Sequence, residues 1–218
     1  MDSLMSLVYL EKRMADYSPK KATLSDSILS GEFEIPKEGF ETTHTSIVDS
    51  ENNAVSITTT LNLNYGSKVM VDNAGFFLNN EMDDFSAKAG TPNGFGLIGG
   101  EANAVEANKR PLSSMSPTIV MKEGKPYIVT GSPGGSRIIT TTMQIIMNVI
   151  DHDFNIAEAT NAARVHHQWL PDVIMMEPNK FDITVKQNLQ SLGYLLNEED
   201  SPVIGKVAGI LVLDNPLS

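Results

Sequence analysis

The sequence contains no cysteine, and this absence excludes several kinds of site at once. Without thiols there is no disulfide framework, no thiolate nucleophile and no metal held by cysteine. It says nothing about cellular compartment, because a cysteine-free chain is compatible with any. No Asn-x-Ser/Thr acceptor sequence is present either, so glycosylation gives no indication of where the protein works.

Positive charge and long apolar runs are also scarce. The chain has 16 Lys and Arg against 27 Asp and Glu, and its formal charge is −11 at pH 7. Non-specific binding to nucleic acid or to anionic membrane needs basic patches, so we expect neither partner. No apolar run approaches the length that spans a bilayer. The N-terminus is a poor signal peptide, since Asp2 interrupts its apolar stretch and no small-residue cleavage motif follows. Localisation stays open.

The first half of the main region reads as hairpins separated by loops. With 218 residues, 41% of them hydrophobic, the chain is long enough to bury a core. Runs at 45–49 and 54–62 flank a polar turn and predict a β-hairpin. A second hairpin is expected from 117–121 and 127–130, with Gly124 in its turn. Further extended segments are expected at 69–71 and 75–78, and a loop at 92–107.

The second half reads mainly as helices. The run 136–150 is apolar on most sides, which predicts a helix buried on most sides. Three further elements are expected downstream: a helix from the capping pair Asn155 and Glu158 to Arg164, a helix from Asp182 to Gly193, and a strand over 205–213. Buried helices beside these strands give a layered α+β architecture.

Residues 1–41 differ from the rest of the chain. Apolar residues from Leu4 to Met14 predict a short helix that ends near Ala15, followed by loop over 20–41. On composition alone, an ordinary linker and a functional propeptide are equally compatible with this segment. We therefore divide the chain into a leader, 1–41, and a domain, 42–218.

Thr42 opens the first predicted strand in the triplet Thr42-Thr43-His44. A threonine hydroxyl is a weak nucleophile unless a base takes its proton, and the α-amine of an N-terminal threonine can be that base. Its ordinary pKa, about 8, suits neutral pH. Thr42 is internal, so this chemistry first requires cleavage of the Glu41–Thr42 bond. A bare Thr-Thr pair is more simply the start of a strand.

Two pairs of residues downstream could take part in catalysis or substrate binding, each in a different way. Gly134 and Gly135 precede the apolar helix and can present backbone N–H groups to an anionic oxygen, as an oxyanion hole requires. The alternative is a tight turn with a purely structural role. A phosphate loop is disfavoured, because this segment lacks the Gly-Lys-Ser/Thr ending of such loops. Glu81 and Asp84 suit a substrate ammonium group. Charge alone would make them a solvated turn.

Ser113 and Ser114 are neutral hydroxyl donors that can hold a carboxylate. No G-x-S-x-G elbow marks either as a serine nucleophile. Adjacent histidines point in different directions on a helix and to opposite faces on a strand. We therefore interpret His166 and His167 as structural rather than metal-binding, and Trp169 as a packing anchor.

Taken in order, these motifs resemble the small, catalytic subunit of the γ-glutamyltransferases (glutathione hydrolases), a family of N-terminal-nucleophile hydrolases. The resemblance extends from about Thr42 to about Leu170 and rests on the segments 42–44, 78–85, 110–118 and 130–137. It implies half of an αββα fold, action on glutathione and other γ-glutamyl amides with water or an amino acid as acceptor, and autocatalytic cleavage at Glu41–Thr42. It also implies that no metal or organic cofactor is needed, and a periplasmic or extracellular location.

The resemblance also implies a role for each candidate residue. The matching positions are the nucleophile Thr42, its hydrogen-bond partner Thr60, the oxyanion donors Gly134 and Gly135, the amine-side residues Asn62, Glu81 and Asp84, and the carboxylate-side residues Ser113 and Ser114.

Two features depart from the family. Its precursors carry a large subunit before the nucleophile, which supplies an arginine for the substrate carboxylate, whereas only residues 1–41 precede Thr42 here. Arg13 has no matching context, and the chain ends without the family's Asp-Pro-Arg tail. We therefore expect a large-subunit partner or a homodimer. The alternative function is a silent remnant, or a binding module for amino acids or γ-glutamyl compounds.

Overall fold

The computed structural model describes residues 7, 11, 14, 17–24, 42–93, 97–199 and 203–213. The leader helix expected up to Ala15 falls mainly outside these residues, as do Glu41 and the last five residues of the chain. All that follows concerns the described part.

Two antiparallel hairpins form the strands of the main body. The first joins β1 (Thr42–Val48) to β2 (Ala54–Thr60), and the second joins β3 (Thr118–Lys122) to β4 (Lys125–Gly131). In the first turn, the Asp49 carboxylate accepts the backbone N–H groups of Glu51 and Asn53 at 2.8 Å. In the second turn, Glu123 and Gly124 have positive φ. Both predicted hairpins are confirmed.

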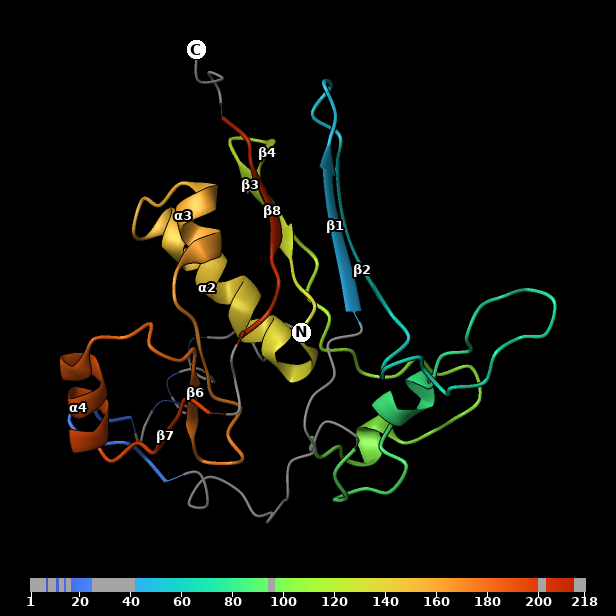
Figure 1. The fold of residues 1–218 in the computed structure, drawn as a ribbon, viewed down its shortest axis with the longest axis horizontal. Helices are drawn as coiled ribbons and strands as arrows, with labels where there is room; N and C mark the ends of the chain where they lie inside the picture. Colours follow the sequence, from blue (N-terminus) through green and yellow to red (C-terminus); the bar gives the residue numbers. More distant parts are fainter. Residues whose placement is uncertain are drawn as a thin grey trace.

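A third strand extends the second hairpin. β8 (Ala208–Leu211) pairs antiparallel with β4 and gives the sheet order β3-β4-β8. The β1–β2 hairpin stacks on this sheet, as the blue and teal strands beside β8 show (Figure 1).

The layer between the two sheets is polar. His44 is buried, with its ring nitrogens 2.7 Å from Thr58 Oγ1 and 3.1 Å from Ser46 Oγ. The hydroxyls of Ser46 and Ser56 donate at 3.0 Å to backbone carbonyls of β8 and β4. The His44 ring lies so close to Gly131 that an added Cβ there would overlap it. Hydrogen bonds, rather than packing of apolar side chains, therefore fix the position of one sheet on the other.

Helices cover the opposite face of the β3-β4-β8 sheet. α2 (Ile138–Ile150) and α3 (Ile156–Asn161) lie on the side away from the hairpin (Figure 1). The core between helices and sheet is built on Ile128, Ile145 and Val149. The order helix, sheet, sheet confirms the predicted layered α+β architecture.

The expectation that the apolar helix is buried on most sides was wrong for the described chain. One face of α2 packs on the sheet, but Ile139, Met143 and Ile150 on its other face are each about half exposed, at 53%, 51% and 49%. The outer face of the β1–β2 hairpin is open in the same way, with Ile47 and Ile57 exposed. Among the described residues, α2 and the hairpin each pack through one face and leave their other apolar face exposed.

A smaller region follows the helices. It contains β5 (Val165–His166), β6 (Ile174–Met176), β7 (Leu196–Asn197) and α4 (Ile183–Ser191). These three short strands were not predicted. The expected caps are confirmed: Asn155 and Glu158 form a reciprocal capping box, and the Asp182 carboxylate caps α4.

α3 ends earlier than predicted, at Asn161, because the chain then turns into β5. A buried ion pair at this turn joins Arg164 to Glu177 at 3.3 Å. The Arg164 guanidinium also donates to the backbone carbonyls of Thr160 and Ile204. The pair therefore ties α3, β6 and the segment that leads into β8 together.

The segment from β2 to β3 is mostly loop. It contains the short 3-10 helices η2 (Glu81–Asp84) and η3 (Glu101–Asn103). The extended segments expected at 69–71 and 75–78 make only a single bridge, between Met70 and Phe77. Among the described residues, no helix has the length and apolar character needed to cross a bilayer.

Candidate active site

Thr42 lies at the start of β1, directly opposite Thr60 at the end of β2. The Thr42 hydroxyl donates a hydrogen bond to Thr60 Oγ1 at 3.1 Å, and the backbone N–H of Asn62 donates to the same oxygen at 2.9 Å. Hairpin register therefore places the two hydroxyls together. The Thr42 side chain is held in one orientation by a partner that is itself fixed.

Asn62 is buried and takes a positive φ of 76° just after β2. Asparagine tolerates this left-handed conformation better than most residues. Its side chain donates to the Asn80 carbonyl at 3.1 Å, and the Asn80 side chain accepts the Leu63 N–H at 3.1 Å. These bonds join the end of the hairpin to the segment that leads into η2. Asn62 thereby connects the Thr42 end of the site to the acidic turn.

One pocket brings most of the predicted residues together. Its walls come from the hairpin end, the acidic turn, the loop before β3 and the start of α2, and it is lined by Thr42, Thr60, Asn62, Asp84, Leu97, Ser113, Ser114, Met115, Gly135, Ser136 and Ile138. Seven of the nine candidates are in this set. The other two, Glu81 and Gly134, adjoin it through Asp84 and Gly135.

Glu81 and Asp84 are two acids on η2 whose carboxyl groups influence each other's pKa. Burial raises the pKa of Glu81 to about 7, with the neighbouring Asp84 charge as the next cause. Burial also raises the pKa of Asp84. Glu81 Oε1 is buried and accepts no hydrogen bond from any described residue. A cationic donor would satisfy this oxygen and relieve the repulsion between the two carboxylates.

The glycine pair lies between β4 and α2. Gly134 and Gly135 have φ of 142° and 57°, conformations that glycine adopts without a steric penalty. Gly134 is buried, and Gly135 begins the 3-10 turn η4 (Gly135–Arg137) that leads into α2. The local chemistry suits an anionic oxygen, because backbone N–H groups at such a turn are not used by helix hydrogen bonds.

The serine pair lies on the loop before β3. Ser113 is exposed and its hydroxyl accepts the Met115 N–H at 3.1 Å, whereas Ser114 is half-buried. Both hydroxyls can donate to an anionic ligand, and both line the same pocket as Asp84.

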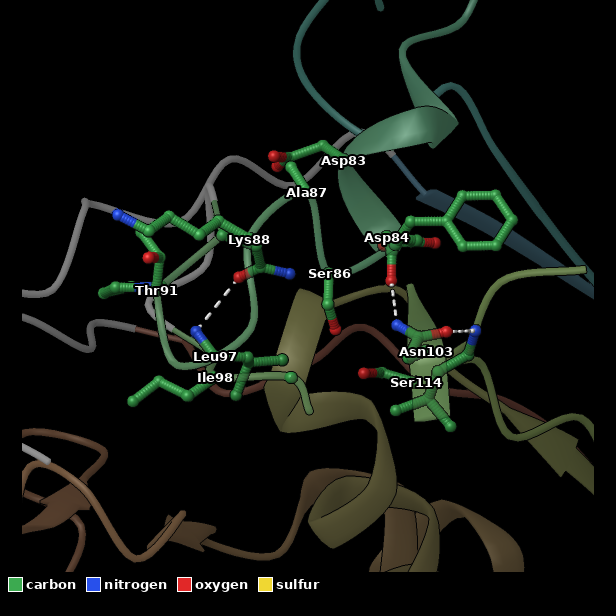
Figure 2. Close-up of a pocket in the computed structure, with 15 residues that line it drawn as sticks. Asp83, Asp84, Ser86, Ala87, Lys88, Thr91, Leu97, Ile98, Asn103 and Ser114 are labelled. Atoms are coloured by element: carbon green, nitrogen blue, oxygen red, sulfur yellow. Dashed lines mark hydrogen bonds between the residues drawn. The ribbon is translucent and has the colours of Figure 1, made fainter. Parts of the chain in front are cut away.

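A second pocket, drawn in Figure 2, adjoins the first, and the two have Asp84, Leu97 and Ser114 in common. Asn103 lines the second pocket, where its side chain donates to the Asp84 carbonyl at 2.7 Å and accepts the Leu112 N–H at 2.9 Å. Asn103 thus fixes the acidic turn relative to the serine loop.

Several residues of the site were missed from the sequence. Ser136, Met115 and Leu97 line the pocket although none was named as a candidate: Ser136 and Met115 lie within the segments that carry the resemblance, and Leu97 lies outside them. Ser136 directly follows the glycine pair, so its position was available as a signal. His166 is buried on β5 and His167 is partly exposed, with Nε2 3.2 Å from Asp172. No cluster of metal-ligating side chains occurs in the part of the chain that the structure describes.

Comparison with known proteins gives consistent matches. A sequence model of the family described as gamma-glutamyltranspeptidase matches residues 1–218. The glutathione hydrolase proenzyme of Escherichia coli (strain K12) is 57% identical over 166 residues, which make up 76% of this chain and 28% of that protein. The glutathione hydrolase proenzyme of Pseudomonas sp. (strain A14) is 49% identical over 190 residues, 87% of this chain and 33% of that protein.

A solved structure is similar as well. The crystal structure of a mutant Helicobacter pylori gamma-glutamyltranspeptidase has a TM-score of 0.77 and 57% sequence identity, and the match covers 79% of this chain and 92% of that chain. This likeness confirms the N-terminal-nucleophile-hydrolase type of fold that the sequence predicts. The chain spans only about a third of the two proenzymes, at 28% and 33% of their length.

Proposed function

Because the chain belongs to the γ-glutamyltranspeptidase family, we propose that it is the nucleophile-bearing part of a glutathione hydrolase. Its substrates are γ-glutamyl amides such as glutathione, and its acceptors are water or an amino acid. One observation carries the proposal: a single pocket unites a threonine hydroxyl, a carboxylate, two serines and a glycine turn. The relatives' printed names, glutathione hydrolase proenzyme, agree with that chemistry.

The first reaction is maturation of the chain itself. The Thr42 hydroxyl attacks the carbonyl carbon of Glu41, and the peptide C–N bond breaks as the acyl group moves to the hydroxyl oxygen. The α-amine of Thr42 is free once that bond breaks, and water then hydrolyses the ester, which releases the Glu41 carboxylate and restores the hydroxyl. The hydrogen bond to Thr60 supports this role because it holds the hydroxyl in place.

The freed amine makes turnover possible. It takes the proton from the Thr42 hydroxyl as the oxygen attacks the γ-carbonyl, then passes it to the departing amine. A γ-glutamyl ester of Thr42 forms, and water or an acceptor amine cleaves it in the second half. Negative charge on the carbonyl oxygen is stabilised by N–H groups of the Gly134–Gly135 turn. An ester intermediate divides one difficult step into two easier ones.

The other polar residues bind the substrate's amino-acid end. The α-ammonium group meets Glu81 and Asp84, where a buried carboxylate oxygen lacks a donor among the described residues. Asn62 assists on the same side. The α-carboxylate receives the hydroxyls of Ser113 and Ser114. The two charged groups on the substrate's α-carbon therefore meet protein groups of opposite polarity, and this anchors the amino-acid end so that the γ-carbonyl lies near Thr42.

The partner is a large subunit. The open faces of α2 and of the β1–β2 hairpin are apolar, and such faces usually mark an interface. The proenzymes that match this chain are far longer than the part it spans, so they have the length to supply a cover. The resemblance assigns a carboxylate-binding arginine to the same subunit. Sedimentation of the chain alone should show association, and a stable, active monomer would contradict this.

Turnover of a γ-glutamyl anilide tests the nucleophile. Thr42→Ala should lower kcat by about a thousandfold or more, since nucleophile and base are lost together. Thr43→Ala is the matched control: the neighbouring side chain is exposed on the opposite face of β1 and should leave the rate unchanged. Activity that survives Thr42→Ala would remove Thr42 from the mechanism. Glutamate binding without any turnover would instead favour a binding module.

Intact-mass spectrometry tests maturation separately. After days at neutral pH the chain should divide into a leader and a body that begins at Thr42, and Thr42→Ala should stay whole. A wild-type chain of unchanged full mass would leave Thr42 without a free α-amine, and the proposed base would be lost.

A further inference from the structure

The glycine turn next to Thr42 needs external support. Gly134 and Gly135 both have positive φ, and glycine is the residue with the most backbone freedom to lose on ordering. An oxyanion hole works only if its N–H groups are held in position before the reaction. Something other than the glycines themselves must therefore fix this turn.

A set of side-chain hydrogen bonds provides that support from β5. The buried Ser136 hydroxyl, directly after the glycines, donates to Gln168 Oε1 at 2.6 Å. The amide of Gln168 is oriented by its own Nε2, which donates to the Leu170 carbonyl at 3.1 Å. His166 Nε2 lies 2.9 Å from the same Oε1. Because this oxygen can only accept, the proton of neutral His166 is on Nε2.

The same histidine connects to the helix that follows the turn. With its proton on Nε2, His166 accepts at Nδ1 from the Thr140 hydroxyl at 2.7 Å. The path therefore runs from Ser136 in the turn through Gln168 and His166 to Thr140 near the start of α2. It fixes Ser136 and Thr140 relative to β5, although both are far from it in sequence.

Burial keeps the histidine in the form this network needs. His166 is 2% exposed, and desolvation lowers its pKa below the ordinary value. The neighbouring Arg137 charge lowers the pKa further, while the hydrogen bond to Gln168 raises it. The imidazole is therefore neutral at pH 7. It acts as a bridge with one donor and one acceptor, and it does not line the pocket that contains Thr42.

We propose that His166 and Gln168 are positioning residues that hold the Gly134–Gly135 turn in its oxyanion-binding conformation. This inference rests on the proposed function. Neither residue touches the substrate: they act through Ser136 and Thr140.

The experiment uses four variants and one control. Gln168→Leu and His166→Leu break the path at its centre, and Ser136→Ala removes its link to the turn with little change in volume. His166→Gln is the conservative variant, because its amide can still donate to Gln168. His167→Leu is the control: it alters the neighbouring side chain, which lies outside the path.

Two readouts separate a positioning role from a merely structural one. Amide resonances of 15N-labelled glycine should move or broaden for Gly134 and Gly135 in the three disrupting variants, and stay in place in His166→Gln and the control. In the same three variants kcat with a γ-glutamyl anilide should fall by about a hundredfold, the loss expected for one oxyanion donor. The Kd for glutamate should be unchanged.

Unmoved glycine resonances in the disrupting variants would overturn the inference, as would an equal kcat loss in His167→Leu. So would a failure of His166→Gln to retain the wild-type spectrum. If the wild-type chain shows no turnover, the proposed function fails, but the glycine spectra still decide whether the path holds the turn. If either leucine variant fails to fold, Ser136→Ala decides the matter.

Discussion

Binding of an amino-acid ligand at the acidic turn should release a proton. Burial and the Asp84 charge raise the pKa of Glu81 to about 7 in the free chain. An ammonium group beside the pair favours the ionised form, so the pKa falls when the ligand binds. At pH 6 the Glu81 carboxyl is about 90% protonated, and binding should expel about 0.9 proton per ligand. At pH 8 that number should fall to about 0.1.

The affinity should follow the same change. Because the ligand must displace the proton from Glu81, the apparent Kd for L-glutamate should be about tenfold weaker at pH 6 than at pH 8. Isothermal titration calorimetry in two buffers of different ionisation enthalpy counts the protons directly. The Thr42→Ala chain suits the experiment, since it cannot turn over a γ-glutamyl ligand.

Two variants make the assignment specific. Glu81→Gln should abolish the proton release and flatten the dependence of Kd on pH, at the cost of weaker binding overall. Glu101→Gln alters a nearby exposed acid of η3 and should leave both quantities as in the parent. Glutamate that binds with no buffer-dependent enthalpy between pH 6 and pH 8 would refute the reasoning. So would proton release that persists in Glu81→Gln.

Three further predictions concern stability and can be read from urea unfolding midpoints. Gly131→Ala should cost about 1–3 kcal/mol, because the new Cβ would overlap the His44 ring; an unchanged midpoint would contradict the described packing. Glu177→Ala should cost about 3–5 kcal/mol by leaving Arg164 buried and unpaired, whereas the exposed Glu106→Ala should change little; equal effects would contradict this. Burial lowers the pKa of His44 below 6.5, so the unfolded chain binds its proton first and the free energy of unfolding should fall as pH drops below 6.5; His44→Asn should weaken that fall.

Local patterns predicted the local structure well. The hairpins follow from alternating runs and turn residues, and the capping box of Asn155 with Glu158 follows from their spacing. The short strands β5, β6 and β7 could not be predicted. Each has only two or three residues and depends on tertiary contacts such as the buried pair of Arg164 and Glu177. An uncovered helix face follows from the expectation of a large-subunit partner, but an all-round apolar sequence does not say which face of α2 stays open.

The candidate site was predictable to a different degree. Thr42 opposite Thr60 follows from hairpin register, but the proximity of Asp84 to Ser114 does not follow from periodicity. Those two residues were found through the family resemblance. The support of the glycine turn was missed entirely, because the bond from Ser136 to Gln168 joins segments that are distant in the sequence.

The polar layer between the sheets has a consequence for how the nucleophile is placed. Packed methyl groups tolerate a slide of one strand layer over another, since each new contact resembles the last. The hydroxyls of Ser46 and Ser56 each donate to a carbonyl of the opposite sheet, and the His44 ring lies where Gly131 has no Cβ, so a slide of one sheet over the other would bring a side chain against the ring. The β1–β2 hairpin therefore packs on the β3-β4-β8 sheet in one position only. The position of Thr42, at the end of the hairpin, is therefore set by hydrogen bonds that form several residues away.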